Sequence, residues 1–141
     1  MNEHGKTVVL ITSAPAPIGP YSQAIKAGGL VFVSGQIALD PATGALVGAD
    51  AAAQTKKVLE NIEAILEAAG SALVRAVKTT IFLTDLAEFA KVNEVYATYF
   101  PFEPPARSTV QVAALPKGAK VEIEVVASCK HELDQFGSSK F

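Results

Sequence analysis

The feature that most restricts this chain is an excess of strand-like segments over helices. The residue pattern predicts about six short strands and two helices, in the order β-β-β-α-β-α-β-β. Each helix has one apolar stripe, so it can cover a sheet on one side only. Two helices cannot cover both faces of a six-stranded sheet. We therefore expect an α+β fold with one sheet face left uncovered.

Both helices are marked by apolar periodicity and by their ends. The first follows Asp50, a good N-cap residue, and ends before Gly70, which suits the position just past a helix. The second begins near Asp85 and Glu88, which have capping-box spacing, and ends before Pro101. The two predicted stripes are Val58, Ile62, Ile65, Leu66 and Ala69, and then Phe89, Val92, Tyr96, Tyr99 and Phe100.

Proline and glycine separate the remaining segments. Three prolines within residues 13–21 forbid a helix or a central strand, so this stretch is predicted to be a stiff loop. Residues 40–44 carry a strong turn signal. The predicted strands are residues 7–11, two strands within 24–39 on either side of Gly28-Gly29, and residues 74–83, 107–112 and 120–127.

The composition provides more apolar residues than a lone small domain needs. Hydrophobic residues make up 50% of the 141 residues and charged residues 18%, against about 25% charged in typical domains. The length fits one domain, predicted as 1–141 with a core of about 7–130 and a mobile tail at 131–141. No apolar run approaches the ~18 residues of a membrane span. We expect the surplus in a core and a subunit interface.

Scarce residue types exclude several kinds of site. The single cysteine, Cys129, cannot form a disulfide framework or a thiolate zinc cluster. The two histidines, His4 and His131, lie near the ends and suit a locked catalytic base poorly. We see no metal-ligand cluster and no phosphate-binding glycine pattern. A net charge of −2 argues against nucleic-acid binding, and the absence of a secretory apolar segment predicts a cytoplasmic protein.

The last two predicted strands carry polar side chains that could form a site. Residues two apart in a strand share a face, so Arg107, Thr109 and Gln111 share one. Glu122 and Glu124 share a face of the final strand in the same way. If these two strands pair, the five side chains form one polar face. The alternative is a solvated sheet face with cross-strand ion pairs.

Other candidates also have a structural alternative. Arg107 follows a rigid proline segment and could bind a carboxylate through two hydrogen bonds, or be an exposed arginine at a strand start. Ser34-Gly35 could permit close backbone approach by a ligand or a neighbouring chain, or form a bulge before a turn. Tyr21, fixed by the preceding proline, could line a pocket or cap a core edge. Asn93 could bond a neighbouring loop or face water.

Six motifs together resemble one known family. They are Ile18-Gly19-Pro20-Tyr21-Ser22-Gln23-Ala24, Val33-Ser34-Gly35-Gln36-Ile37, Gln54-Thr55 with Leu59-Glu60-Asn61-Ile62, Phe89-Ala90-Lys91-Val92-Asn93, Pro105-Ala106-Arg107-Ser108-Thr109-Val110, and the ten residues 115–124 (LPKGAKVEIE). Over about residues 11–130 the chain resembles the Rid family of reactive-intermediate deaminases, within it the RidA subfamily.

This resemblance implies a chorismate-mutase-like α+β fold, with a six-stranded, mostly antiparallel sheet and two helices on one face. It implies a homotrimer with a central β-barrel and three intersubunit clefts. The implied reaction is 2-iminobutanoate/2-iminopropanoate deamination, in which 2-aminoacrylate-type enamine and imine acids are hydrolysed to 2-keto acids and ammonia. No cofactor or metal is implied. The implied ligands are small enamine or imine acids and 2-keto acids.

The resemblance also assigns roles to positions of this chain. Arg107 matches the arginine that binds the substrate carboxylate, and Glu122 matches the acid that positions or activates water. Thr109 stands where many RidA members have cysteine, which leaves backbone contacts there and removes a thiol role. The positions implied to line the cleft are Tyr21, Ser34, Gly35 and Asn93.

Two other functions are kept as alternatives. One is an endoribonuclease or translation inhibitor, a role reported for family relatives, against which the pI of about 5.7 and the lack of a basic run argue. The other is a non-catalytic sensor that binds 2-keto acids in the same clefts. The presence of both Arg107 and Glu122 favours chemistry over sensing.

Overall fold

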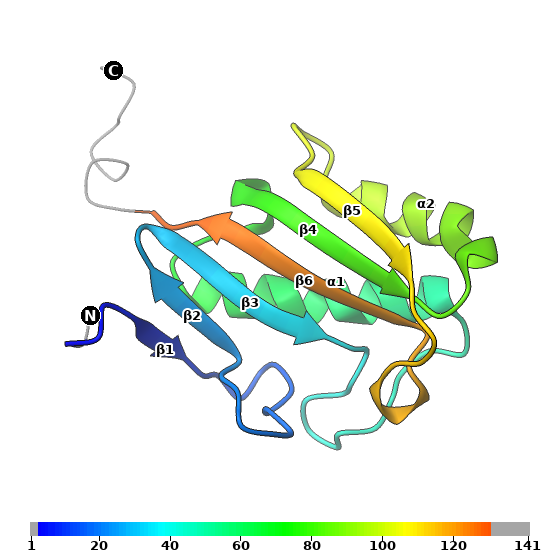
Figure 1. The fold of residues 1–141 in the computed structure, drawn as a ribbon, viewed down its shortest axis with the longest axis horizontal. Helices are drawn as coiled ribbons and strands as arrows, with labels where there is room; N and C mark the ends of the chain where they lie inside the picture. Colours follow the sequence, from blue (N-terminus) through cyan, green and yellow to red (C-terminus); the bar gives the residue numbers. More distant parts are fainter. Residues whose placement is uncertain (1–2, 131–141) are drawn as a thin grey trace.

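The computed structural model describes residues 3–130, so the predicted tail at 131–141 lies outside the described residues. Six strands form one sheet in the order β1-β2-β3-β6-β4-β5 (Figure 1). Only β4 and β5 pair in parallel, which confirms the mostly antiparallel sheet. The strands are β1 (Thr7–Val9), β2 (Ala24–Ala27), β3 (Leu30–Gln36), β4 (Ala76–Leu83), β5 (Ala106–Gln111) and β6 (Val121–Ser128).

Both helices, α1 (Ala51–Ala68) and α2 (Phe89–Tyr99), lie behind the sheet in Figure 1, on one face as predicted. The Asp50 side chain accepts a hydrogen bond from the amide of Ala53 at 2.8 Å and caps α1. Gly70 follows the helix with φ +79°, a conformation that favours glycine. Alternate β6 residues face the helices and are almost fully buried with the α1 stripe: Val121, Ile123, Val125 and Ala127.

Short 3-10 turns modify two predicted boundaries. Residues predicted to begin the strand at 74 form η1 (Leu73–Arg75) instead, so β4 begins at Ala76. Asp85 caps η2 (Leu86–Glu88) by accepting from the amide of Ala87 at 2.9 Å. The Glu88 carboxylate accepts a hydrogen bond of 3.2 Å from the amide of Ala51, the first residue of α1. The predicted capping box is therefore wrong, because Glu88 joins the start of α1 to η2.

The last two strands do not pair with each other, so the condition for the single polar face is not met. β4 lies between β5 and β6, because α2 connects β4 to β5 as a crossover, and such a crossover produces a parallel pair. Arg107 is opposite Thr79, which is buried against α2, so Arg107 lies on the helix side. Glu122 is opposite Phe82, which lies on the other face. The expected polar face of arginine, threonine, glutamine and two glutamates does not form.

The face away from the helices is uncovered and partly apolar, as the helix count predicted. Phe32 is opposite Val126 and is 44% exposed, while Val110 is opposite Phe82 and is 41% exposed. We call these four residues the open apolar face. Across residues 3–130, no helix combines the length and apolar character needed to cross a membrane.

Candidate active site

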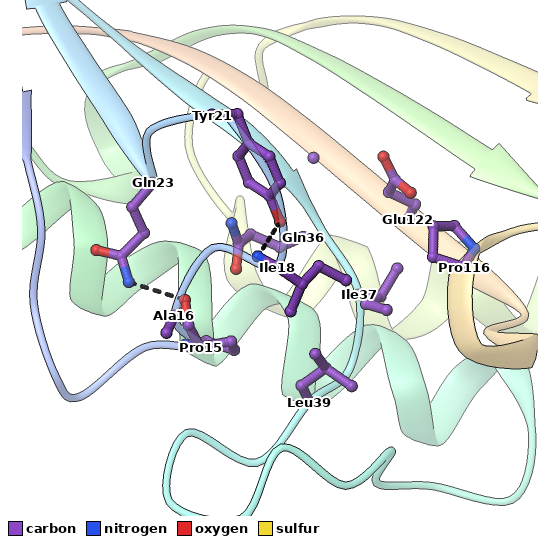
Figure 2. A pocket seen from close by; sticks show the side chains of 11 residues that line it. Pro15, Ala16, Ile18, Tyr21, Gln23, Gln36, Ile37, Leu39, Pro116 and Glu122 are labelled. Atoms are coloured by element: carbon purple, nitrogen blue, oxygen red, sulfur yellow. Dashed lines mark hydrogen bonds between the residues drawn. The ribbon is translucent and has the colours of Figure 1, made fainter.

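The loop at residues 13–21 is held in place by one buried amide. Gln23 is 1% exposed, and its Oε1 accepts from the Ile11 amide at 2.8 Å. Its Nε2 donates to the carbonyls of Ile11, Ala14 and Pro15 at 3.1, 3.3 and 2.9 Å. Figure 2 shows Gln23 directed at this loop. Gln23 is not among the predicted site residues, although a glutamine at the start of an apolar strand, directly after a proline loop, was the available signal.

Tyr21 ends this loop and lines a pocket, which is the first of its two predicted alternatives. Its amide donates to the Gly19 carbonyl at 2.8 Å, and its hydroxyl accepts from the Ile18 amide at 3.3 Å. The side chain is 47% exposed. These short-range bonds hold the aromatic ring beside the pocket that it lines, with its hydroxyl at the Ile18 amide (Figure 2).

Ser34 and Gly35 form an irregularity in β3 where its pairing with β6 shifts between Val33 and Gln36. The Ser34 hydroxyl donates to the Ser22 carbonyl at 2.5 Å, and its amide donates to the Gln23 carbonyl at 3.0 Å. A Cβ at Gly35 would overlap the Glu122 carboxylate. The predicted bulge is therefore confirmed, and the missing Cβ of Gly35 leaves room for the Glu122 carboxylate of the same chain.

Glu122 projects from β6 into this pocket, opposite Tyr21 and beside Pro116 (Figure 2). Its pKa is raised by partial burial and, secondly, by the like charge of Glu124. Within residues 3–130 its carboxylate has no hydrogen-bond or salt-bridge partner. The adjoining open cleft has a volume of about 420 Å³. A half-buried carboxylate with a raised pKa and no partner is suited to accept or return a proton.

We call this first group the glutamate half-site, and its members come from the 13–21 loop, β3 and β6. They are Tyr21, Ser34, Gly35 and Glu122.

Arg107 lies elsewhere, over α2. Its Nη1 donates to Oδ1 of Asn93 at 2.7 Å, so Asn93 bonds a residue of β5 and neither of its two predicted alternatives describes it. Its guanidinium carbon is 5.3 Å from the ring centroid of Phe89 and 5.0 Å from that of Tyr96. Both distances are within cation–π range. We call these four residues the arginine half-site, which opens on a groove of about 720 Å³.

Thr109 follows Arg107 by two residues and is paired with Ile81 on the helix side. Its Oγ1 is buried and has no hydrogen-bond partner among the residues that the structure describes. Neither half-site pocket includes its side chain.

The two half-sites lie on opposite faces of the sheet. Arg107 shares the helix side with Thr79, whereas Glu122 shares the open face with Phe82. The structure thus brings Tyr21, Gly35 and Glu122 together and brings Arg107 and Asn93 together. Within the described part of one chain, it does not bring Arg107 to Glu122.

Replacing Gln23 by leucine is expected to destabilise the protein and loosen the 13–21 loop. The four hydrogen bonds of Gln23 would be lost, and each buried polar group left without a partner costs about 1–3 kcal/mol. We expect a loss of at least about 2 kcal/mol in the free energy of unfolding, measured by urea denaturation.

The matched control is Gln111→Ala, because Gln111 is exposed and makes one bond to the Leu86 amide. That change is expected to cost less than about 1 kcal/mol. Equal losses for the two variants would show that Gln23 is not the anchor of the loop.

Comparisons with known proteins agree on one family. A family model described as Endoribonuclease L-PSP matches residues 11–129. The mouse 2-iminobutanoate/2-iminopropanoate deaminase is 48% identical over 122 residues, covering 86% of this chain and 90% of its own length.

Solved structures give the same result. A putative endoribonuclease from Thermotoga maritima has a TM-score of 0.85 at 49% identity, covering 89% of this chain and 98% of that one. TdcF of E. coli, solved with bound serine, has a TM-score of 0.82 at 43% identity, covering 88% and 99%.

Proposed function

Because this chain belongs to the Rid/Endoribonuclease L-PSP family, some of whose relatives are named imine deaminases, we propose that it hydrolyses 2-imino acids. The products would be 2-keto acids and ammonia, with 2-aminoacrylate-type enamines entering as their imine tautomers. The observation that carries this proposal is the Glu122 carboxylate, half-buried without a partner beside Tyr21 and with a raised pKa.

Each half-site supplies one requirement of this reaction. Arg107 has no carboxylate within salt-bridge distance among residues 3–130, so its charge is available to a ligand. The planar guanidinium matches a carboxylate with two parallel hydrogen bonds. The serine reported in TdcF supports an amino-acid-like ligand in this family.

The chemistry follows from these two anchors. Arg107 holds the substrate carboxylate, which fixes the position of C2 and removes part of the entropic barrier. Water adds to C2 of the protonated imine while Glu122 accepts a proton from it. The carbinolamine nitrogen then takes that proton from Glu122, and the C–N bond breaks as the C2 hydroxyl gives its own proton to Glu122 and becomes the carbonyl. Ammonia takes this second proton from Glu122 and leaves as ammonium. A base or acid in this role contributes about 10²–10⁴-fold.

The complete site requires a second copy of the chain. Arg107 and Glu122 lie on opposite faces of one sheet, so one chain presents them in different directions. The open apolar face also needs a cover. We place the arginine half-site of one subunit against the glutamate half-site of its neighbour, in a homotrimer whose open faces line a central barrel. Tyr21, Ser34, Gly35, Asn93 and the Thr109 backbone would line each cleft.

This assembly has a direct test. The protein is expected to have three times the 14.7 kDa chain mass in light scattering. Phe32→Glu places a charge on the open apolar face and should shift the mass towards one chain, with loss of deaminase activity. Phe102→Glu, at a phenylalanine that is 74% exposed and outside that face, is the control. A monomer with full activity would contradict the intersubunit site.

The function itself is tested by mixing the purified protein with imino acids generated in solution from several amino acids. The proposal expects faster release of keto acid and ammonia than in buffer alone. Binding of 2-keto acids with no rate enhancement would overturn it in favour of a sensor.

The endoribonuclease alternative rests on the description of the matching family and on the name of the Thermotoga relative. It predicts RNA binding that weakens with salt, because phosphate contacts release counterions. RNA cleavage that persists while imine hydrolysis is absent would favour this alternative. The net charge of −2 weighs against it.

A further inference from the structure

We infer that Tyr96, anchored by Thr79, is a positioning residue that holds the Arg107 guanidinium ready for the substrate carboxylate. The inference rests on the proposed function, since it takes Arg107 as the carboxylate-binding group. Tyr96 lines the groove of the arginine half-site, and Thr79 lies behind it; the motif resemblance assigns a role to neither residue.

The contacts run from the core outward. Thr79 is fully buried in β4, and its hydroxyl shares a hydrogen bond of 2.8 Å with that of Tyr96. Tyr96 is 5% exposed, and Phe100 packs on it with ring centroids 4.6 Å apart. The Tyr96 ring therefore has a fixed orientation. Because Thr79 is also opposite Arg107 in the parallel register, strand pairing brings the anchor beside the residue that it serves.

Arg107 needs this support, because it lies on β5, an edge strand, and is exposed. A long flexible side chain loses rotamer entropy when a ligand orders it. Asn93 fixes one nitrogen, while the faces of Phe89 and Tyr96 contact the flat guanidinium. An acidic partner would fix the arginine equally well, but it would neutralise the charge. Aromatic faces and an amide oxygen hold the cation and leave its charge available.

Loss of the Tyr96 contact should affect substrate binding more than the chemical step. Carboxylate binding by Arg107 is made in both the ground state and the transition state, so weakening it should raise KM more than it lowers kcat. Tyr96→Leu removes the ring face and is expected to raise KM for the imine, and Kd for 2-ketobutyrate, by about tenfold. Tyr96→Phe keeps the ring but loses the bond to Thr79, so its effect should be smaller.

The Thr79 anchor has its own test. Thr79→Val leaves the buried Tyr96 hydroxyl without its partner and should raise KM. Combining Thr79→Val with Tyr96→Phe removes both hydroxyls and should restore KM towards the wild-type value, because a matched apolar pair is tolerated. Tyr99→Leu, at an aromatic residue of α2 that does not contact Arg107, controls for a general loss of helix packing.

A double-mutant cycle shows whether Tyr96 acts through Arg107. In an Arg107→Ala background, Tyr96→Leu should change the Kd for 2-ketobutyrate no further, because the group that it positions is absent. Additive effects would overturn the inference and show that Tyr96 acts only on the fold.

A readout that needs no ligand separates this inference from the proposed function. In the wild type, the Arg107 Nε–H resonance should carry a ring-current shift, and Tyr96→Leu should move it towards the value of a free arginine. An unchanged resonance would overturn the positioning role, whether or not the protein hydrolyses imines. A shifted resonance in a wild type without imine hydrolysis would instead reject the proposed function alone.

Discussion

Arg107→Ala is expected to remove the acceleration of keto-acid and ammonia release from freshly generated 2-aminoacrylate. A hydrogen bond to a charged group contributes about 1.5–3 kcal/mol, and a carboxylate held by a guanidinium makes two. The expected fall in kcat/KM is therefore about 10²–10⁴-fold. Ammonia release should be followed while a dehydratase generates the substrate in the same solution.

The control for charge is Arg107→Lys, which keeps the cation but loses the planar pair of donors. It should recover only a small part of the activity. Folding is expected to survive in both variants, because Arg107 is exposed and its side chain contacts one amide and two aromatic rings. Wild-type rates in Arg107→Ala, with an intact fold by circular dichroism, would remove Arg107 from the site.

Glu122→Gln is expected to lower kcat by about 10²–10⁴-fold and leave 2-keto-acid binding largely intact. The amide keeps the shape of the side chain but cannot accept the proton of water. In the wild type, activity should rise with pH as Glu122 deprotonates, with a midpoint above the ordinary value of 4.5. The measurement is kcat and the product Kd across a pH series.

The same variant should be more stable than the wild type at about pH 7. The raised pKa means that the folded state binds a proton more tightly than the unfolded chain does. Folded-state stability therefore falls as pH rises through the unfolded value of 4.5 and up to the folded value, and the cost persists above it. Glutamine removes this cost, so the two melting temperatures should converge below about pH 4.

Glu124→Gln provides the matched control for Glu122→Gln. Glu124 lies on the same face of β6 and raises the pKa of Glu122 by its like charge. Its removal should keep turnover and shift the rise in activity to lower pH. If Glu122→Gln kept wild-type kcat, or if its melting temperature relative to the wild type did not depend on pH, the role given to Glu122 would be wrong.

Local patterns predicted most elements of the fold. The stripe of α1, its Asp50 cap and Gly70 at its end depend on neighbouring residues, and all three appear as expected. The proline loop and the turn near Asp40 follow from backbone restrictions in the same way. The boundary at Ala76 and the Glu88 contact differ because each depends on packing against a distant element.

Strand neighbours could not be obtained from the same local patterns. The faces of 107–111 and of 121–125 were assigned correctly within each strand, but whether the two strands pair was left as a condition. β4 intervenes because the 76–83 strand pairs with both. Gln23, Thr79 and Tyr96 were missed as supporting residues because their partners are distant in sequence.

The sequence by itself determined most of the helices and strands, the one-sided helices and the uncovered sheet face, because these follow from periodicity and backbone restrictions. It also drew attention to Arg107 and Glu122. Only the tertiary structure decided that β4 separates their strands and directs them to opposite faces. The physical reason is that side-chain period is set within a strand, whereas strand order depends on how α2 crosses over the sheet.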